Sequence, residues 1–155
     1  LLLCGSDPAL AAASDGAAPR WWFTVGGATE QGETLAEAAA RELHEETGLQ
    51  VQPSELIGPV WRREAVIEFN GSVMQSEEMF FVHRTRRFEP VTAGRTGLER
   101  AYIHEHRWCD ATMIEELVAK GEPVYPLQLG ELLEEAKALA DARGGVPRRT
   151  PQSIR

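Results

Sequence analysis

Apolar and polar positions along the first third of the chain predict two strands separated by a loop. Residues 1–4 are almost wholly apolar, as at the end of a buried strand. Residues 5–20 are rich in Ala, Gly, Ser and Asp and are typical of a loop. The run Trp-Trp-Phe-Thr-Val at residues 21–25 is aromatic and β-branched and predicts a second strand, which two glycines then interrupt.

The clearest helix is predicted over residues 34–47. Thr34 and Glu37 have the spacing of a capping box, in which each side chain satisfies a free backbone N–H of the first turn. Gly48 is suited to end the helix in the left-handed conformation. Four small or apolar residues at helical spacing predict the face that packs on a sheet: Leu35, Ala38, Ala39 and Leu43.

A β-hairpin is predicted in the middle of the chain. Residues 56–69 and 72–84 have strand-like composition and flank the dipeptide Asn70-Gly71. That dipeptide suits a two-residue turn, which needs positive φ at both positions. A long loop is then expected over residues 90–98.

The last third of the chain is predicted to be mainly helical. A short strand is expected over residues 106–109, and helices over residues 111–120 and 126–142. Residues 143–155 combine Gly, Pro and Arg and are predicted to be a flexible tail. A chain of 155 residues is long enough for one domain with its own core, which we assign to residues 1–142.

Composition and charge fit one globular domain and disfavour two classes of partner. Apolar residues make up 43% and charged residues 26% of the chain, a usual globular mixture. No apolar run approaches the roughly 20 residues that a membrane span needs. The net charge of −8 opposes nucleic-acid binding, although a divalent cation would let acidic side chains bind an anionic nucleotide. Cys4 and Cys109 are interpreted as reduced thiols of a cytoplasmic protein.

Three glutamates on the predicted helix form the first candidate for chemistry. Glu42, Glu45 and Glu46 occupy positions i, i+3 and i+4, and they therefore project from one side of the helix. Like charges at this spacing repel each other. A hard cation such as Mg²⁺ would reverse that penalty, because it prefers oxygen ligands. The triplet alone is more typical of a solvated acidic face than of a metal site.

The sequence around this triplet follows a longer pattern. Its fixed positions are Gly27-x5-Glu33-x7-Arg41-Glu42-Leu43-x-Glu45-Glu46-x-Gly48-Leu49. Chance agreement at so many positions, given this composition, is on the order of one in a million. The pattern resembles the signature of the Nudix hydrolase family, the Nudix box. The order of predicted elements up to about residue 142 is also similar to that family.

The resemblance implies both a fold and an activity. The fold is α+β, with a mixed, curved β-sheet sandwiched between α-helices. The activity is Mg²⁺-dependent hydrolysis of a phosphoanhydride bond in a nucleoside diphosphate linked to another moiety X, by attack of water on phosphorus. The substrate would be a small nucleotide, a nucleotide sugar or a related metabolite, and Mn²⁺ can replace Mg²⁺. Homodimerisation is common in the fold and is left open here.

The resemblance also implies roles for the matched residues. Arg41 and Glu33 match positions that orient the metal-binding glutamates, and Arg can hold a carboxylate in bidentate geometry. Glu45 and Glu46 are assigned to catalysis together with Arg41. Four groups are expected to bind the metal ions: the side chains of Glu42, Glu45 and Glu46 and the backbone carbonyl of Gly26.

The general base is left open by the sequence. It is either a glutamate of the box or one of four later acids, namely Glu77, Glu78, Glu99 and Glu105. We select Glu99 as the catalytic candidate, because relatives often carry such a residue in the stretch that corresponds to residues 90–104.

Substrate contacts are predicted from the central strands. Arg62, Arg63 and Arg84 are candidates for holding phosphates, and strand alternation places Arg62 and Arg63 on opposite faces. Arg63 is our choice. Four aromatic side chains are candidates for stacking on a base or for core packing: Trp21, Trp22, Trp61 and Phe69.

Two other functions are built on the same fold. One is a non-catalytic nucleotide-sensing or regulatory domain, which would have no need to retain the full set of glutamates. The other is an isomerase of isoprenoid diphosphates, which needs further catalytic groups that neither Cys4 nor Cys109 obviously supplies. The downstream markers of ADP-ribose and dinucleoside polyphosphate hydrolases are absent, and the base and the group X stay undetermined.

Overall fold

The computed structural model describes residues 1–15, 18–142 and 150–155. The strands are β1 Leu2–Ser6, β2 Arg20–Thr24, β3 Ile57–Phe69, β4 Ser72–Val82, β5 Ile103–Arg107, β6 Val124–Tyr125 and β7 Gln152–Ser153. The helices are α1 Pro8–Ala13, α2 Leu35–Thr47, α3 Gly97–Tyr102, α4 Ala111–Ala119 and α5 Leu129–Asp141, with a short 3₁₀ turn, η1, at Pro53–Glu55.

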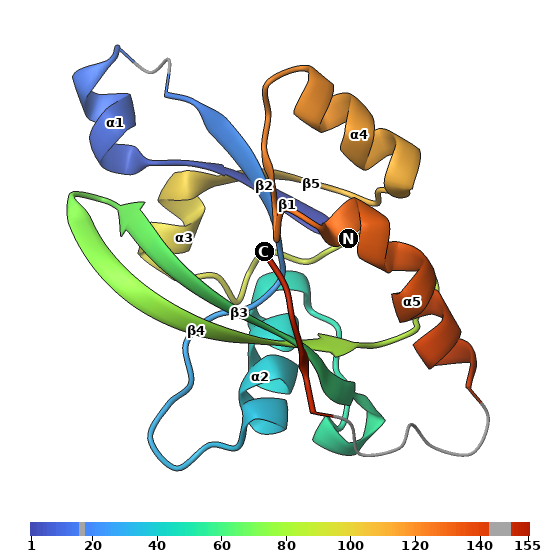
Figure 1. Cartoon of the computed structure of the whole chain (residues 1–155). Coiled ribbons are helices and arrows are strands. Elements are labelled where there is room, and N and C mark those ends of the chain that lie inside the picture. The colour runs from blue at the N-terminus through green and yellow to red at the C-terminus, as the bar shows by residue number, and fades with distance from the viewer. Residues whose placement is uncertain (16–17, 143–149) are drawn as a thin grey trace.

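The strands pair into two mixed sheets. One has the order β5-β1-β2-β6 and the other the order β4-β3-β7. Strand β1 is antiparallel to β2 and β5, whereas β2 and β6, like β3 and β7, run parallel. Figure 1 shows the strands crossing the middle of the molecule, with α2 on one side and α1 and α4 on the other. The α+β class expected from the sequence is confirmed, with hydrogen bonding divided between two sheets.

Elements with strong local signals form where the sequence predicted them. Thr34 caps α2 through the complete capping box with Glu37, and Gly48 ends the helix with φ +79°. The hairpin of β3 and β4 turns at Asn70 and Gly71, whose φ angles are +50° and +76°. These positive φ values are those of the expected two-residue turn.

Three short elements lie in segments that were predicted as loops or boundaries. Helix α1 occupies part of the predicted loop 5–20, because Asp7 accepts hydrogen bonds from the N–H groups of Ala9 and Leu10. Helix α3 begins at the end of the predicted loop 90–98, where Thr96 and Glu99 form a second capping box. Strand β5 ends at Arg107, so the strand predicted at 106–109 lies a few residues too late.

Residues 152–153, which belong to the flexible tail predicted over 143–155, form strand β7. Residues 143–149 lie outside the described part of the chain. Strand β7 pairs with β3, and the N–H of Ile154 donates to the carbonyl of Arg62 at 2.9 Å. The Ile154 side chain is buried. The tail prediction is therefore wrong for residues 152–154, because a nearby strand edge supplies partners that local sequence does not reveal.

The hydrophobic core lies between the two sheets and the last two long helices. It joins side chains from both sheets, from α4 and α5 and from the C-terminus: Leu2, Cys4, Trp22, Trp61, Ile114, Leu117, Val124, Leu129, Leu132 and Ile154. Strand alternation places Trp22 in this core. Its neighbours Trp21 and Phe23 contact Phe69 and Tyr102, respectively, outside that core. No helix within the described residues is long and apolar enough to cross a membrane.

The buried face of α2 differs from the predicted apolar stripe. Leu35 is 44% exposed, whereas Glu42 and Glu46 are buried together with Ala38 and Ala40. Glu42 and Glu46 on the acidic side of the helix therefore face other protein segments, whereas the Glu45 side chain is 40% exposed. Burying carboxylates is unfavourable unless they gain partners. Two buried glutamates therefore mark this side of α2 as the candidate functional site.

Candidate metal centre and active site

Helix α2 places Glu42 and Glu46 one turn apart on its inner side. The turn after β2 crosses this side of the helix, and the N–H of Gly26 donates to Glu46 Oε2 at 2.9 Å. A third carboxylate arrives from α3, where Glu99 lies in the first turn. One carboxylate oxygen from each of Glu42, Glu46 and Glu99 lies within 4.8 Å of the others.

A glycine is required where the turn meets Glu42. A Cβ atom at Gly27 would lie 2.6 Å from Glu42 Oε2 and would overlap the rest of the carboxylate. At Gly26 a Cβ atom would meet nothing within 4 Å. Of the two glycines, Gly27 is therefore the one whose missing side chain makes room for a carboxylate of the cluster.

Arg41 links three acids of the Nudix-box pattern, Glu33, Glu42 and Glu45, into one network. Its Nε and Nη2 donate to the two carboxylate oxygens of Glu33 at 2.7 and 3.1 Å. Its Nη1 donates to Glu42 at 2.9 Å and to Glu45 at 3.1 Å. Arg41 thus fixes the orientation of the Glu42 carboxylate, and charge-assisted bonds of this kind are short and strong. Glu45 contacts Arg41 and is not one of the three clustered acids.

Burial and nearby negative charges disfavour ionisation of Glu42 and Glu46. Desolvation, followed by the charges of Glu42 and Glu99, raises the pKa of Glu46 to about 8, against the lowering effect of the Gly26 hydrogen bond and of Arg95. Desolvation also raises the pKa of Glu42, although Arg41 lowers it. The phenol of Tyr102 has a pKa raised to about 12, first by burial and then by these same carboxylates.

The donor set fits a hard divalent cation. Glu46 is 1% exposed, and its Oε1 is buried without a hydrogen-bond partner. A buried carboxylate oxygen with no donor is costly, and a cation would satisfy it. Three carboxylates within 4.8 Å of one another offer the all-oxygen environment that Mg²⁺ prefers. The residues present thus suit a Mg²⁺ or Mn²⁺ ion.

The other acids predicted as candidate bases lie in ion pairs on the strands. Glu78 accepts from Arg63 at 2.7 and 2.9 Å across the β3–β4 hairpin, and Arg63 also lies 5.6 Å from the centre of the Tyr125 ring. Glu77 pairs with Arg62, and Glu105 pairs with Arg20 and Arg107. Arg84 pairs with Asp141. Glu99 is the only predicted base outside the box that joins the cluster of described residues.

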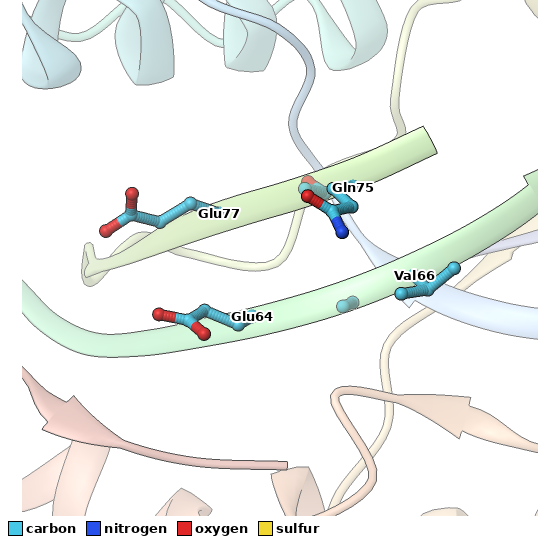
Figure 2. Close-up of a pocket in the computed structure, with 6 residues that line it drawn as sticks. Glu64, Val66, Gln75 and Glu77 are labelled. Atoms are coloured by element: carbon cyan, nitrogen blue, oxygen red, sulfur yellow. The ribbon is translucent and has the colours of Figure 1, made fainter. Parts of the chain in front are cut away.

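A shallow hollow lies elsewhere on the β3–β4 hairpin. Figure 2 shows Glu64 and Glu77 side by side on adjacent strands, with Val66 and Gln75 further along. Both acids already pair with Arg62. This hollow contains none of the clustered carboxylates, so it is not the candidate metal centre.

Comparison with known proteins identifies the family. The model of the NUDIX domain matches residues 2–128, most of the chain. The chain belongs to the Nudix family. No curated protein matches it significantly. The Nudix match includes β1, β2, the whole box and α3, and it therefore covers every residue of the acidic cluster.

Nudix membership supports a general activity, hydrolysis of pyrophosphate linkages in small nucleotide substrates with divalent metal ions. The sequence alone predicts the box glutamates and Glu99 as site residues. It missed Arg95, which lies against the last turn of α2. Arg95 donates to a backbone carbonyl, and such a partner leaves no pattern in the sequence.

Proposed function

We propose that this Nudix protein is a Mg²⁺-dependent hydrolase of a phosphoanhydride bond in a nucleoside diphosphate linked to another moiety X. The observation that carries the proposal is the buried cluster of Glu42, Glu46 and Glu99, with an unpartnered oxygen on Glu46. Glu99 is half-buried, but Glu42 and Glu46 are buried at a cost, which a sensing domain that bound no metal would have no reason to bear.

Glu42 and Glu46 would hold the metal, with the Glu99 carboxylate and the backbone of Gly26 beside them adding to the site. When bound, divalent ions supply positive charge to the diphosphate oxygens and lower the pKa of water. Arg41 holds Glu42 through an ion pair that Glu33 reinforces, so the ligand is oriented before substrate arrives. Electrostatic stabilisation and positioning supply most of the rate in reactions at phosphorus.

Glu99 is our candidate for the group that accepts a proton from the attacking water. It reaches the cluster from a different element, α3, and it is less buried than Glu42 or Glu46. A base must lie within hydrogen-bond reach of the water that it activates, and among the predicted later acids Glu99 is the one beside the metal ligands. Glu45, which contacts Arg41, would support the cluster or a further ion.

The test is metal-dependent turnover of a substrate panel. Phosphate release would be measured for nucleoside triphosphates, nucleotide sugars, ADP-ribose and dinucleoside polyphosphates, with Mg²⁺ and with Mn²⁺. We expect one class to be hydrolysed and Glu46→Gln to lower kcat by at least about 10³-fold, because the variant loses a charged metal ligand. Glu134→Gln, a change to an exposed glutamate of α5, serves as the matched control. Metal binding by folded protein without turnover of any panel member would favour the nucleotide-sensing alternative.

A further inference from the structure

The loop that precedes α3 is fastened to the C-terminal turn of α2. The N–H of Val91 donates to the carbonyl of Thr47 at 2.8 Å. Gly94 packs so closely on the helix that a Cβ atom would lie 2.6 Å from the carbonyl oxygen of Glu45. The loop therefore follows the backbone of the residues that carry the box glutamates.

Arg95 makes the innermost of these contacts. Its side chain is buried, with the residue 7% exposed, and its Nε and Nη2 both donate to the backbone carbonyl of Glu46 at 3.3 Å. The last carbonyls of a helix lack partners within the helix, and the helix dipole favours a cation there. Arginine suits this place because its planar fork presents two donors to one acceptor.

Arg95 is connected to Glu99 through the capping box at the start of α3. Thr96 follows Arg95 directly and caps α3. The N–H of Thr96 donates to Glu99 Oε2 at 2.6 Å, and the N–H of Glu99 donates to Thr96 Oγ1 at 3.2 Å. The place where Arg95 binds α2 therefore fixes the place of the Glu99 carboxylate.

We propose that Arg95 is a positioning residue, which locks the start of α3 to the last turn of α2 and so holds Glu99 against Glu42 and Glu46. The inference rests on the proposed metal site. It explains why a charged side chain is retained in a buried position, where an apolar side chain would fill space without the cost of desolvation.

Charge and position predict opposite effects on metal binding. Removing a positive charge beside the cluster would by itself strengthen the binding of a divalent cation, because like charges repel. Releasing Glu99 from its place would weaken binding, because the cluster would lose a preorganised carboxylate. Residues that orient metal ligands typically contribute about 10- to 100-fold in affinity. The sign of the change therefore separates the two roles.

The experiment is a titration of the full chain with Mn²⁺, with free Mn²⁺ followed by electron paramagnetic resonance. We expect Arg95→Met to weaken binding by about tenfold. Arg84→Met removes an exposed arginine that pairs with Asp141, and it should leave binding unchanged. Arg95→Lys keeps the charge and one donor, and it should restore part of the affinity. Adding Glu99→Gln to Arg95→Met should cost less than Glu99→Gln costs in the native chain.

A second variant covers the case in which Arg95→Met does not fold. Gly94→Ala leaves every charge in place but forces the loop away from Glu45, and it should weaken Mn²⁺ binding in the same direction. Unchanged or tighter binding in a folded Arg95 variant, or fully additive losses with Glu99→Gln, would overturn the inference. If Glu46→Gln and Glu99→Gln themselves leave Mn²⁺ binding unchanged, the proposed metal site fails instead.

Discussion

At the scale of single residues, Glu46 occupies a place where a carboxylate is unfavourable on three counts. It is 1% exposed, it lies in the last turn of α2, and two further carboxylates adjoin it. Burial, the negative end of the helix dipole and like charges all disfavour its ionised form. The N–H of Gly26 and the nearby Arg95 offset only part of this cost. A divalent cation would offset the remainder, so the cost is understandable as the price of a preorganised ligand.

Gly27 provides a test of how finely this cluster is built. A methyl group in Gly27→Ala would displace the Glu42 carboxylate, which is the flexible end of a side chain. We therefore expect a small change in the free energy of unfolding, about 1 kcal/mol or less, but a loss of metal affinity of about tenfold or more. Mn²⁺ titration and chemical denaturation measure the two quantities.

The control for this prediction is Gly97→Ala. A Cβ atom at Gly97 would meet nothing within 4 Å, so both metal affinity and stability should stay close to those of the native chain. Equal Mn²⁺ affinity in Gly27→Ala and Gly97→Ala would show that the position of the Glu42 carboxylate does not depend on the close contact with Gly27.

At the scale of elements, the sequence predicted those whose signals are local. The capping box of Thr34 and Glu37 and the dipeptide Asn70-Gly71 act through neighbouring backbone atoms, so α2 and the hairpin formed where expected. The same kind of signal at Thr96 and Glu99 was available and would have revealed α3. Strands β6 and β7 have only two residues each and depend on partner strands far away in the chain.

The residues of the candidate site likewise divide into those that local sequence predicts and those that depend on distant segments. The box pattern identified Glu42 and Glu46, since their spacing on one helix face follows from helix geometry. The predicted apolar stripe nevertheless included Leu35, which is exposed, and left out Glu42 and Glu46, which are buried. Periodicity could not reveal that α3 and the turn after β2 would cover the acidic face of α2. Nor could it reveal Arg95, whose partner is a main-chain carbonyl.

Strand β7 gives a prediction at this scale. Ile154 is buried in the core and its N–H donates to the carbonyl of Arg62, so Ile154→Ala leaves a cavity beside β3. We expect a loss of about 2–4 kcal/mol in the free energy of unfolding, measured by chemical denaturation. Val66→Ala, at a side chain that is 68% exposed on β3, should change stability by less than about 0.5 kcal/mol. Similar losses for both variants would mean that the C-terminal segment does not pack stably.

At the scale of the whole molecule, the cluster joins segments that lie far apart in the chain. The turn after β2 and helix α2 bring Gly26, Glu42 and Glu46 together, and the segment from Val91 to Glu99 closes over the end of α2. The acidic site is therefore formed only in the folded protein. Its electrostatic cost must then appear in the stability of the metal-free chain, and metal binding must be linked to folding.

The pH dependence of stability tests this linkage. The pKa of Glu46 is about 8 in the folded protein, against an ordinary value of 4.5, so between these values the unfolded chain is ionised at this residue while the folded protein retains the proton. The folded protein therefore binds more protons at Glu46 than the unfolded chain does in this range. The contribution of Glu46 to the free energy of unfolding is fully present below pH 4.5 and is lost as the pH rises to 8. Without metal, the stability of Glu46→Gln relative to the native chain should therefore rise across this range, by on the order of 5 kcal/mol in total. Denaturation curves at several pH values measure the difference, and Glu134→Gln should show none. Saturating Mg²⁺ should instead stabilise the native chain more than the variant, because only the native chain keeps its ligand. A difference that is constant with pH would show that Glu46 is ionised in the folded protein at no cost.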